Sequence, residues 1–217
     1  MLTPHPLITL FVAQGVPMDT VVLLLLFPLI VTLVAIFRQV IGLKAFGIYT
    51  PSIIIFAFLA TGIKYGAALY ITVIVVGMLM RFVLKKFRLL YLPRVALTLT
   101  IVAIAILGAL VIGGSFQRTG LAAVSIFPLL IMITLVEKFV AVQIEKGTRT
   151  ALFLAGETFL IAICGYVLGH WTWLINIVIT APWVVLLAIP FNIFLGKWTG
   201  LRISEYFRFR DVIRRLQ

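Results

Sequence analysis

The sequence predicts an all-α polytopic membrane protein with about seven transmembrane helices. Hydrophobic residues make up 64% of the 217 residues and charged residues only 11%, whereas soluble domains are about half apolar and about a quarter charged. Lys and Arg number 18 against 6 Asp and Glu, and they cluster beside apolar runs. Such clusters are typical of residues that flank membrane spans. The expected surroundings are therefore a lipid bilayer, and nucleic acid is not an expected partner.

Seven apolar runs approach the roughly 20 residues that a helix needs to cross the hydrocarbon core. In chain order they are 20–37, 48–63, 65–80, 95–112, 121–136, 150–168 and 173–195. Residues 1–18 are broken by prolines and glycine, so we expect an interfacial segment there and a transmembrane domain over 19–196. Residues 197–217 mix arginines with apolar side chains, which predicts a basic amphipathic cytoplasmic tail.

The distribution of cationic residues predicts the orientation of the chain. With seven spans, only Lys64 and Arg118 fall on one side of the membrane, and the other 16 Lys and Arg fall on the opposite side. Cytoplasmic loops carry an excess of Lys and Arg. We therefore expect a multi-pass protein of the cell (inner) membrane with its N-terminus outside and its C-terminus in the cytoplasm.

Two stretches of the sequence resemble each other and predict an inverted 3+3 repeat. Gly42-Leu43 precedes Pro51, and Gly120-Leu121 precedes Pro128, each in a short apolar run. The copies begin three spans apart, so they would enter the membrane in opposite directions, as in inverted-repeat transporters. Pro51 and Pro128 are expected to interrupt these helices, because proline removes a backbone donor. Chance similarity between two apolar helices is the alternative.

Glu157 is the first candidate for an intramembrane polar site, because it lies inside the sixth apolar run. A charged side chain at that depth costs about 2.5–3.5 kcal/mol on insertion scales and usually faces a partner or a cavity. The functional hypothesis is a proton or substrate step. The alternative is a neutral carboxyl group, or one that is paired with Arg38 or Arg94.

The expected cytoplasmic face supplies two further hypotheses. Arg38, Lys44 and Arg94 are candidates for contact with an anionic substrate, although cationic residues of this kind also fix topology and anchor anionic lipid. Glu137, Lys138 and Glu145 are candidates for docking a partner. Acidic residues at the cationic boundary of a span do not help to orient the chain in the membrane. Their presence therefore indicates that they pair with specific partner groups.

The sequence contains no motif that predicts catalysis. It has no phosphate-binding glycine-rich loop, no histidine-rich metal helix and no serine nucleophile elbow. Its one cysteine, Cys164, lies in an apolar run, and its two histidines, His5 and His170, are far apart. We therefore expect a non-enzymatic protein without a metal or other cofactor, and a homo-oligomer remains open.

Three segments resemble a known membrane-protein family. They are Arg38-Gln39-Val40-Ile41-Gly42-Leu43-Lys44 with Gly47 and Pro51, then Arg88-Leu89-Leu90-Tyr91-Leu92-Pro93-Arg94, and Phe127-Pro128 with Glu137, Glu145 and Gly147. Over about residues 20–170 the chain resembles the seven-helix domain that is usually fused to an inactive transglutaminase-like domain. More distantly, it looks like the small membrane subunit of poly-γ-glutamate (capsule) synthase.

The resemblance implies partners and a role that composition does not show. It implies a cytoplasmic ATP-dependent amide ligase as a partner, and a further partner domain on the periplasmic or extracellular side. The implied role is a membrane subunit in the synthesis or export of an acidic peptide-like polymer or tag. Two alternatives remain: an autonomous secondary transporter built on the inverted repeat, and a membrane scaffold whose charges serve orientation only.

Overall fold

The described part of the chain is almost entirely helical. The computed structural model describes residues 5–84, 86–87, 90–115 and 126–197, and these residues are 88% helical and contain no strand. Five described helices are long and apolar enough to cross a bilayer: Met18–Ile41, Ile63–Leu84, Tyr91–Ile112, Ile126–Lys146 and Thr148–Gly169. A bent pair, Thr172–Thr180 with Pro182–Gly196, makes a sixth span if it is counted as one. The predicted class, an all-α polytopic membrane protein, is confirmed.

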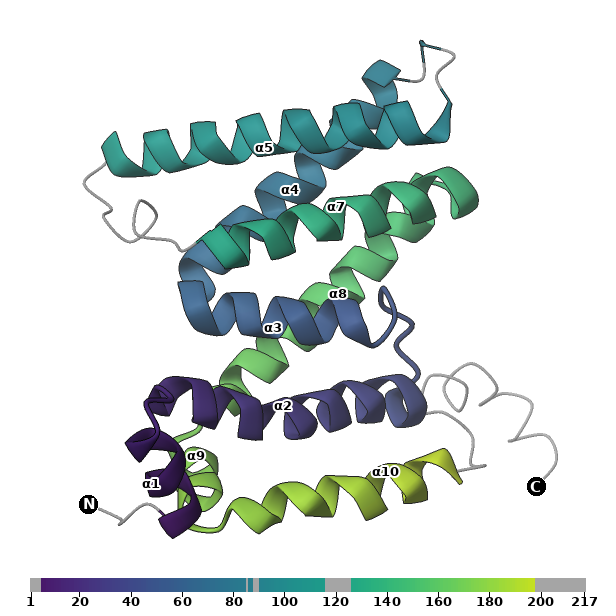
Figure 1. Cartoon of the computed structure of the whole chain (residues 1–217). Helices are drawn as coiled ribbons and strands as arrows, with labels where there is room; N and C mark the ends of the chain where they lie inside the picture. Colours follow the sequence, from purple (N-terminus) through teal and green to yellow (C-terminus); the bar gives the residue numbers. More distant parts are fainter. Residues whose placement is uncertain (1–4, 85, 88–89, 116–125, 198–217) are drawn as a thin grey trace, which may run out of the picture. The chain divides into compact units, whose positions relative to one another are not determined.

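The chain divides into two compact units, Met1–Lys44 with Val167–Gln217, and Ala45–Tyr166. The first unit contains the two ends of the chain (Figure 1). Its described elements are α1 (Pro6–Ala13), α2 (Met18–Ile36), a π-helical turn (Phe37–Ile41), α9 (Thr172–Thr180), a 3₁₀ helix (Pro182–Leu187) and α10 (Ala188–Gly196). The basic tail that the sequence predicts lies, from residue 198 on, outside the described residues.

Polar side chains inside the first unit bond to one another and to backbone carbonyls. Thr32 Oγ1 on α2 donates to the carbonyl of Pro28, at 2.7 Å, and accepts a hydrogen bond from Asn192 Nδ2 on α10, also at 2.7 Å. The His5 backbone N–H before α1 donates to the carbonyl of Ile179 on α9, at 3.0 Å. These bonds satisfy polar groups that lipid cannot, so they stabilise the packing of α10 on α2 and of α1 near α9.

The described part of the second unit is a bundle of five helices. They are α3 (Tyr49–Thr61), α4 (Ile63–Leu84), α5 (Tyr91–Ser115), α7 (Ile126–Lys146) and α8 (Thr148–Gly169), the last belonging to this unit as far as Tyr166. α4 packs against α3, α5 and α7, and α7 also packs against α3 and α5. Tyr70 on α4 donates from its hydroxyl to the carbonyl of Ala155 on α8, at 2.8 Å, and its ring contacts those of Phe58 and Phe159.

Two helix pairs in this bundle are each joined by a single glycine. Gly62 (φ +78°) connects α3 to α4, and Gly147 (φ +88°) connects α7 to α8. Glycine suits these positions because side chains rarely adopt positive φ. α3 and α7 pack together and run in opposite directions (Figure 1). Corresponding helices in two repeats of inverted topology would also run in opposite directions.

α3 is much shorter than the other membrane helices of the unit. Its 13 residues cover about 20 Å at 1.5 Å per residue, against a hydrocarbon core of about 30 Å. Positive φ angles at Gly42, Ala45 and Gly47 keep the preceding segment out of a helix. The second apolar run therefore forms a short helix after an irregular segment.

The two prolines that were expected to interrupt helices lie close to described helix starts. Pro51 is the third residue of α3, and in a first turn the missing N–H has no intrahelical acceptor. Pro51 therefore lies in the first turn of α3 and does not break the helix. Pro128 is the third described residue of α7, and 121–125, which the sequence assigns to the same apolar run, lie outside the described residues.

Candidate functional site

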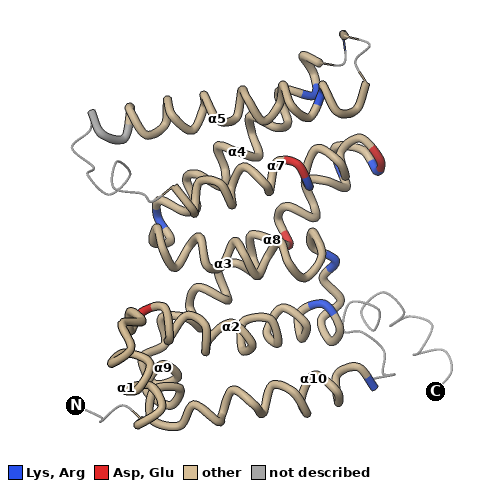
Figure 2. Tube along the Cα trace, viewed as in Figure 1, with Lys and Arg blue, Asp and Glu red and all other residues tan. Residues whose placement is uncertain are grey.

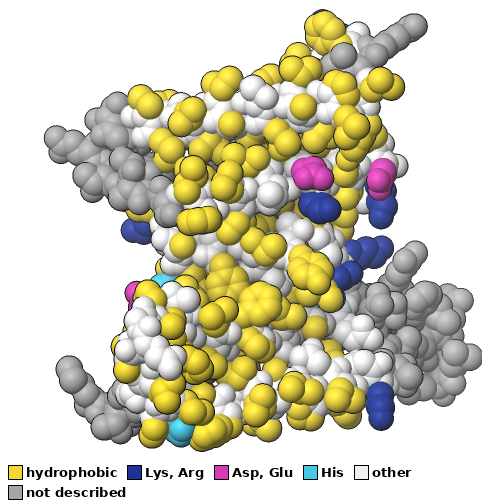
Figure 3. All heavy atoms as spheres, in the orientation of Figure 1, with side chains coloured by type: hydrophobic (Ala, Val, Ile, Leu, Met, Phe, Trp, Pro, Cys, Tyr) yellow, Lys and Arg dark blue, Asp and Glu magenta, His cyan; other side chains and the backbone are white. Residues whose placement is uncertain are grey.

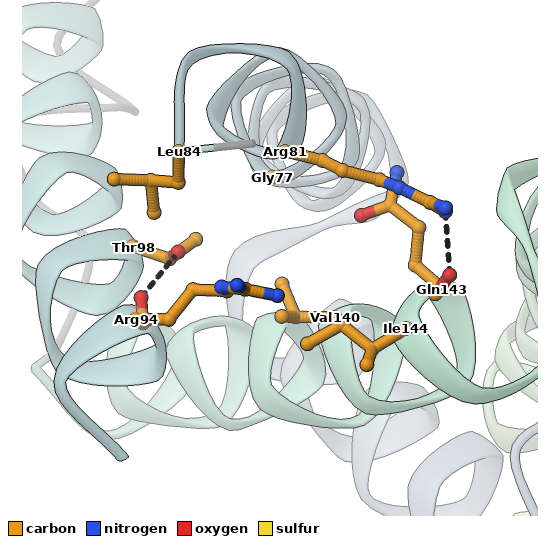
Figure 4. A pocket seen from close by; sticks show the side chains of 8 residues that line it. All are labelled: Gly77, Arg81, Leu84, Arg94, Thr98, Val140, Gln143 and Ile144. Carbon is orange, nitrogen blue, oxygen red and sulfur yellow. Dashed lines mark hydrogen bonds between the residues drawn. The ribbon is translucent and has the colours of Figure 1, made fainter. Parts of the chain in front are cut away.

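A cavity of about 170 Å³ in the second unit is lined by two arginines and a buried glutamine (Figure 4). It lies where the last turns of α4 and α7 meet the first turns of α5. Its lining residues are Gly77, Arg81 and Leu84 from α4, Arg94 and Thr98 from α5, and Val140, Gln143 and Ile144 from α7. Of the three residues predicted to contact an anion, Arg94 lines this cavity, whereas Arg38 and Lys44 belong to the first unit.

Arg81 is held in place by the ends of two helices. Its Nη1 donates to the backbone carbonyl of Gln143 and to Thr148 Oγ1, the latter at 2.7 Å. The carbonyl of Gln143 is one of the last four of α7, which lack intrahelical donors. Arg81 thus caps the C-terminus of α7, and its cation also suits the negative end of that helix dipole. The guanidinium is therefore fixed at one side of the cavity.

Gln143 has a side-chain amide that the described chain does not satisfy. Its side chain is fully buried, and neither the amide nitrogen nor the amide oxygen has a hydrogen-bond partner among the described residues. The side chain lies beside that of Arg81 at the cavity (Figure 4). A buried polar group without a partner costs about 1–3 kcal/mol. The described part of the chain therefore leaves this amide free to bond to water or to a ligand.

Arg94 brings a second cation to the same cavity from the start of α5. It is the fourth residue of that helix, where the helix dipole is positive and disfavours a cation. Its side chain reaches from α5 toward Val140 on α7 (Figure 4). Arg94 therefore adds to the positive potential of the helix N-terminus and does not neutralise it.

The chemistry of the lining predicts a ligand that is anionic and can also bond to an amide. Guanidinium groups bind carboxylate or phosphate with paired, charge-assisted hydrogen bonds. The amide of Gln143 can donate to an anion and accept from an N–H group. Together, Arg81, Arg94 and Gln143 form a site that suits a carboxylate next to a peptide-like amide.

Glu157 lies in a different polar cluster, at the middle of α8. Its Oε2 accepts a hydrogen bond from the backbone N–H of Ala45, at 2.9 Å, and Thr158 Oγ1 accepts one from the N–H of Phe46, at 3.1 Å. Ala45 has φ +42°, which is strained for a residue with a side chain. The cluster therefore holds the irregular segment that precedes α3, and backbone of this kind inside a membrane must be bonded to protein or face water.

The residues predicted to dock a partner are on the surface of α7. Glu137, Lys138 and Glu145 are exposed, and none of them lines the cavity. Their docking role remains a prediction.

Of the three residues that form the proposed polar site, Arg81 and Gln143 were not among the site residues that the sequence predicted. Gln143 has a signal in the sequence, because it continues the face of α7 that carries Val136, Phe139 and Val140, all of them buried. A polar residue on an otherwise apolar buried face indicates an internal polar contact. Arg81 gave no signal beyond its place at the end of an apolar run.

The long apolar helices and the polar contacts made between them define a polytopic α-helical membrane protein. A family model described as seven transmembrane helices usually fused to an inactive transglutaminase matches residues 8–213. The chain belongs to this family, as the resemblance of its motifs indicated. No curated protein and no solved structure is significantly similar to the chain.

Proposed function

We propose that the chain is a non-enzymatic membrane subunit that works with a cytoplasmic ATP-dependent amide ligase. In this role it takes part in the synthesis or export of an acidic peptide-like polymer or tag. The observation that supports the proposal most is the cavity in which Arg81 and Arg94 flank the buried amide of Gln143.

The lining matches the repeating chemistry of an acidic peptide. Each unit of such a polymer carries a carboxylate, which suits the Arg94 guanidinium, and an amide, which suits the side chain of Gln143. A volume of about 170 Å³ has room for about five water molecules. That space suits one unit of a polymer and is too small for a folded segment.

The proposed orientation places this cavity at the cytoplasmic end of the bundle. Basic residues lie at the C-terminal ends of α4 and α7 and at the N-terminal ends of α5 and α8 (Figure 2). In the order of these helix ends, they are Arg81, Lys146, Arg94 and Arg149. Cytoplasmic loops generally carry an excess of Lys and Arg, which supports a cytoplasmic position for that end. A soluble ligase would deliver its product there, and a periplasmic or extracellular partner domain would receive it on the other side.

A second candidate function is an autonomous secondary transporter. It is favoured by the two glycine-joined helix pairs, α3–α4 and α7–α8, in which α3 and α7 run in opposite directions. Inverted repeats in transporters surround a substrate site between the repeats. In the scaffold alternative, the cavity would have no ligand.

The binding proposal is tested with the purified chain in lipid nanodiscs and a fluorescent tetraglutamate peptide. Arg94→Gln should weaken binding roughly ten- to a hundredfold, because a hydrogen bond to a charged group contributes about 1.5–3 kcal/mol. Arg149→Gln is the matched control, since Arg149 is exposed, lies over the Phe153 ring and does not line the cavity. Equal losses in both variants would mean that only general surface charge attracts the peptide, and the proposal would be wrong.

Partnership with a ligase is tested by purification from the native membrane in mild detergent. Co-purification of an ATP-dependent amide ligase supports the subunit proposal. Ion-coupled uptake of a glutamyl peptide by vesicles that contain the chain alone would support the transporter. If neither occurs and Arg94→Gln leaves product formation unchanged, the scaffold alternative is correct.

A further inference from the structure

An acidic and a basic residue lie next to each other on the exposed face of α7, away from the cavity. Glu137 and Lys138 are both exposed, and they are the twelfth and thirteenth of the 21 residues of this candidate span. Figure 2 shows acidic and basic positions together along α7, and in Figure 3 charged side chains lie among hydrophobic ones on this face. Glu137 comes six residues before Gln143, which lines the cavity. The two residues are therefore separated by about 9 Å along the helix axis.

The helix continues to Lys146, past the predicted end of the apolar run at 136, so Glu137 and Lys138 lie inside this candidate span and not at its boundary, where the sequence predicts them. This position is costly for a charge in lipid. At the centre of a span a charged residue costs about 2.5–3.5 kcal/mol on insertion scales. The long side chain of Lys138 can extend its ammonium group toward the interface, but the shorter Glu137 side chain cannot reach as far. Among the described residues, neither side chain forms a hydrogen bond or an ion pair. The exposed face of α7 therefore has a reason to be covered by protein.

The flanking residues permit another helix to approach this face. Thr134 lies one turn before the charged pair and Ala141 one turn after it, and Thr134 is exposed. Small residues at such positions let two helix backbones come close in a membrane, and polar side chains then bond across the contact. The opposite face of α7 is already occupied, because its buried residues pack against α3, α4 and α5.

We propose that the exposed face of α7 binds a second copy of this chain, with Glu137 of each copy facing Lys138 of the other. An isologous dimer places the same patch on both sides of a two-fold axis, so the patch must be complementary to itself. One acid and one base at adjacent positions meet this requirement. Their depths differ by only about 1.5 Å, so both ion pairs can form at once when two copies share one orientation in the membrane. This inference goes beyond the proposed function and does not depend on the cavity.

The test uses charge reversal in two differently labelled populations of the chain. Purified chains that carry a donor or an acceptor dye are reconstituted in phosphatidylcholine–phosphatidylglycerol vesicles, and energy transfer is measured against the lipid-to-protein ratio. Glu137→Lys places two lysines opposite two lysines, and Lys138→Glu places two glutamates opposite two glutamates. Each variant alone should associate at least roughly tenfold more weakly than the unaltered chain, as expected for the loss of polar contacts between membrane helices.

Mixing the two variants distinguishes contact between two copies from misfolding of either variant. A Glu137→Lys chain and a Lys138→Glu chain present opposite charges at both positions, so the mixture should recover association. The double variant Glu137→Lys/Lys138→Glu should also self-associate. A misfolded chain would not regain association when it is mixed with the other variant, so recovery identifies the charges as the cause.

Glu145→Lys and Lys146→Glu are matched controls on the same helix. These residues form a similar exposed pair at the last two positions of α7, and their reversal should leave association unchanged. The proposal is wrong if the unaltered chain gives no energy transfer above that of a monomeric membrane protein. It is also wrong if the mixture of the two reversed chains associates no better than either chain alone. In that case the charged pair would serve a different partner.

Discussion

Two polar clusters in the second unit differ in how their hydrogen bonds are satisfied. Around the middle of α8, the side chains of Glu157 and Thr158 accept hydrogen bonds from the backbone of Ala45 and Phe46. In the cavity at the ends of α4 and α7, the side chain of Gln143 is fully buried, like that of Thr158, but its amide bonds to no described residue. The first cluster holds the chain together, and the second has bonding capacity left for something else.

This contrast separates structural from binding polar residues inside a membrane bundle. A polar group in lipid must find a partner, so its presence alone does not indicate function. Glu157 was the most conspicuous residue of the sequence, yet it accepts a hydrogen bond from the backbone of this same chain. Gln143 is neutral and inconspicuous, and it is the residue whose side-chain amide finds no partner among the described residues.

The largest effect on stability is expected at Glu157. Glu157→Ala removes the acceptor of the buried Ala45 N–H, which should destabilise the protein by about 1–3 kcal/mol. Glu157→Gln keeps a side-chain oxygen that can accept this hydrogen bond, so its free energy of unfolding should fall much less. Unfolding of the purified variants in detergent with increasing dodecyl sulfate measures both. If the Glu157→Gln variant is as unstable as the Glu157→Ala variant, the hydrogen bond from the Ala45 N–H is not what makes residue 157 important for stability.

A smaller loss is expected at the neighbouring residue. Thr158→Val keeps the shape of the side chain but removes the hydroxyl that accepts from the Phe46 N–H, and it should cost about 1–2 kcal/mol in the same unfolding measurement. Thr158→Ser keeps the hydroxyl and is the matched control. Equal stability of the Val and Ser variants would show that the segment before α3 does not depend on this bond.

No loss of stability is expected at Gln143. Gln143→Leu removes a buried amide that bonds to no described residue, and replacing such a group by an apolar one is nearly neutral or stabilising. The backbone carbonyl that accepts from Arg81 remains. A fall in unfolding free energy of more than about 1 kcal/mol would place Gln143 with Glu157 among the structural residues and remove the contrast between the two clusters.

The sequence predicted the fold class well because that prediction depends on local composition. Each apolar run that is described coincides with one or more helices, and the family motifs were recognisable. The short length of α3 was harder to predict. Gly42 and Gly47 are signals for an irregular segment, but the positive φ of Ala45 depends on contacts that its own sequence does not show.

The site was only partly predictable because its contacts join distant parts of the chain. Arg94 was identified from a cationic motif and does line the cavity. The contact of Glu157 with Ala45 spans 112 positions, and that of Arg81 with Gln143 spans 62. A single sequence does not show such pairings, so the sequence located the polar residues without assigning their roles.

The decisive measurement is the affinity of tetraglutamate for the Gln143→Leu variant in lipid nanodiscs, determined together with the stability of that variant. We expect the peptide to bind at least roughly tenfold more weakly, which corresponds to about 1.4 kcal/mol, while the unfolding free energy stays the same or rises. Unchanged affinity in a stably folded Gln143→Leu variant would contradict the proposed binding role of the cavity, because the buried amide would then have no part in binding.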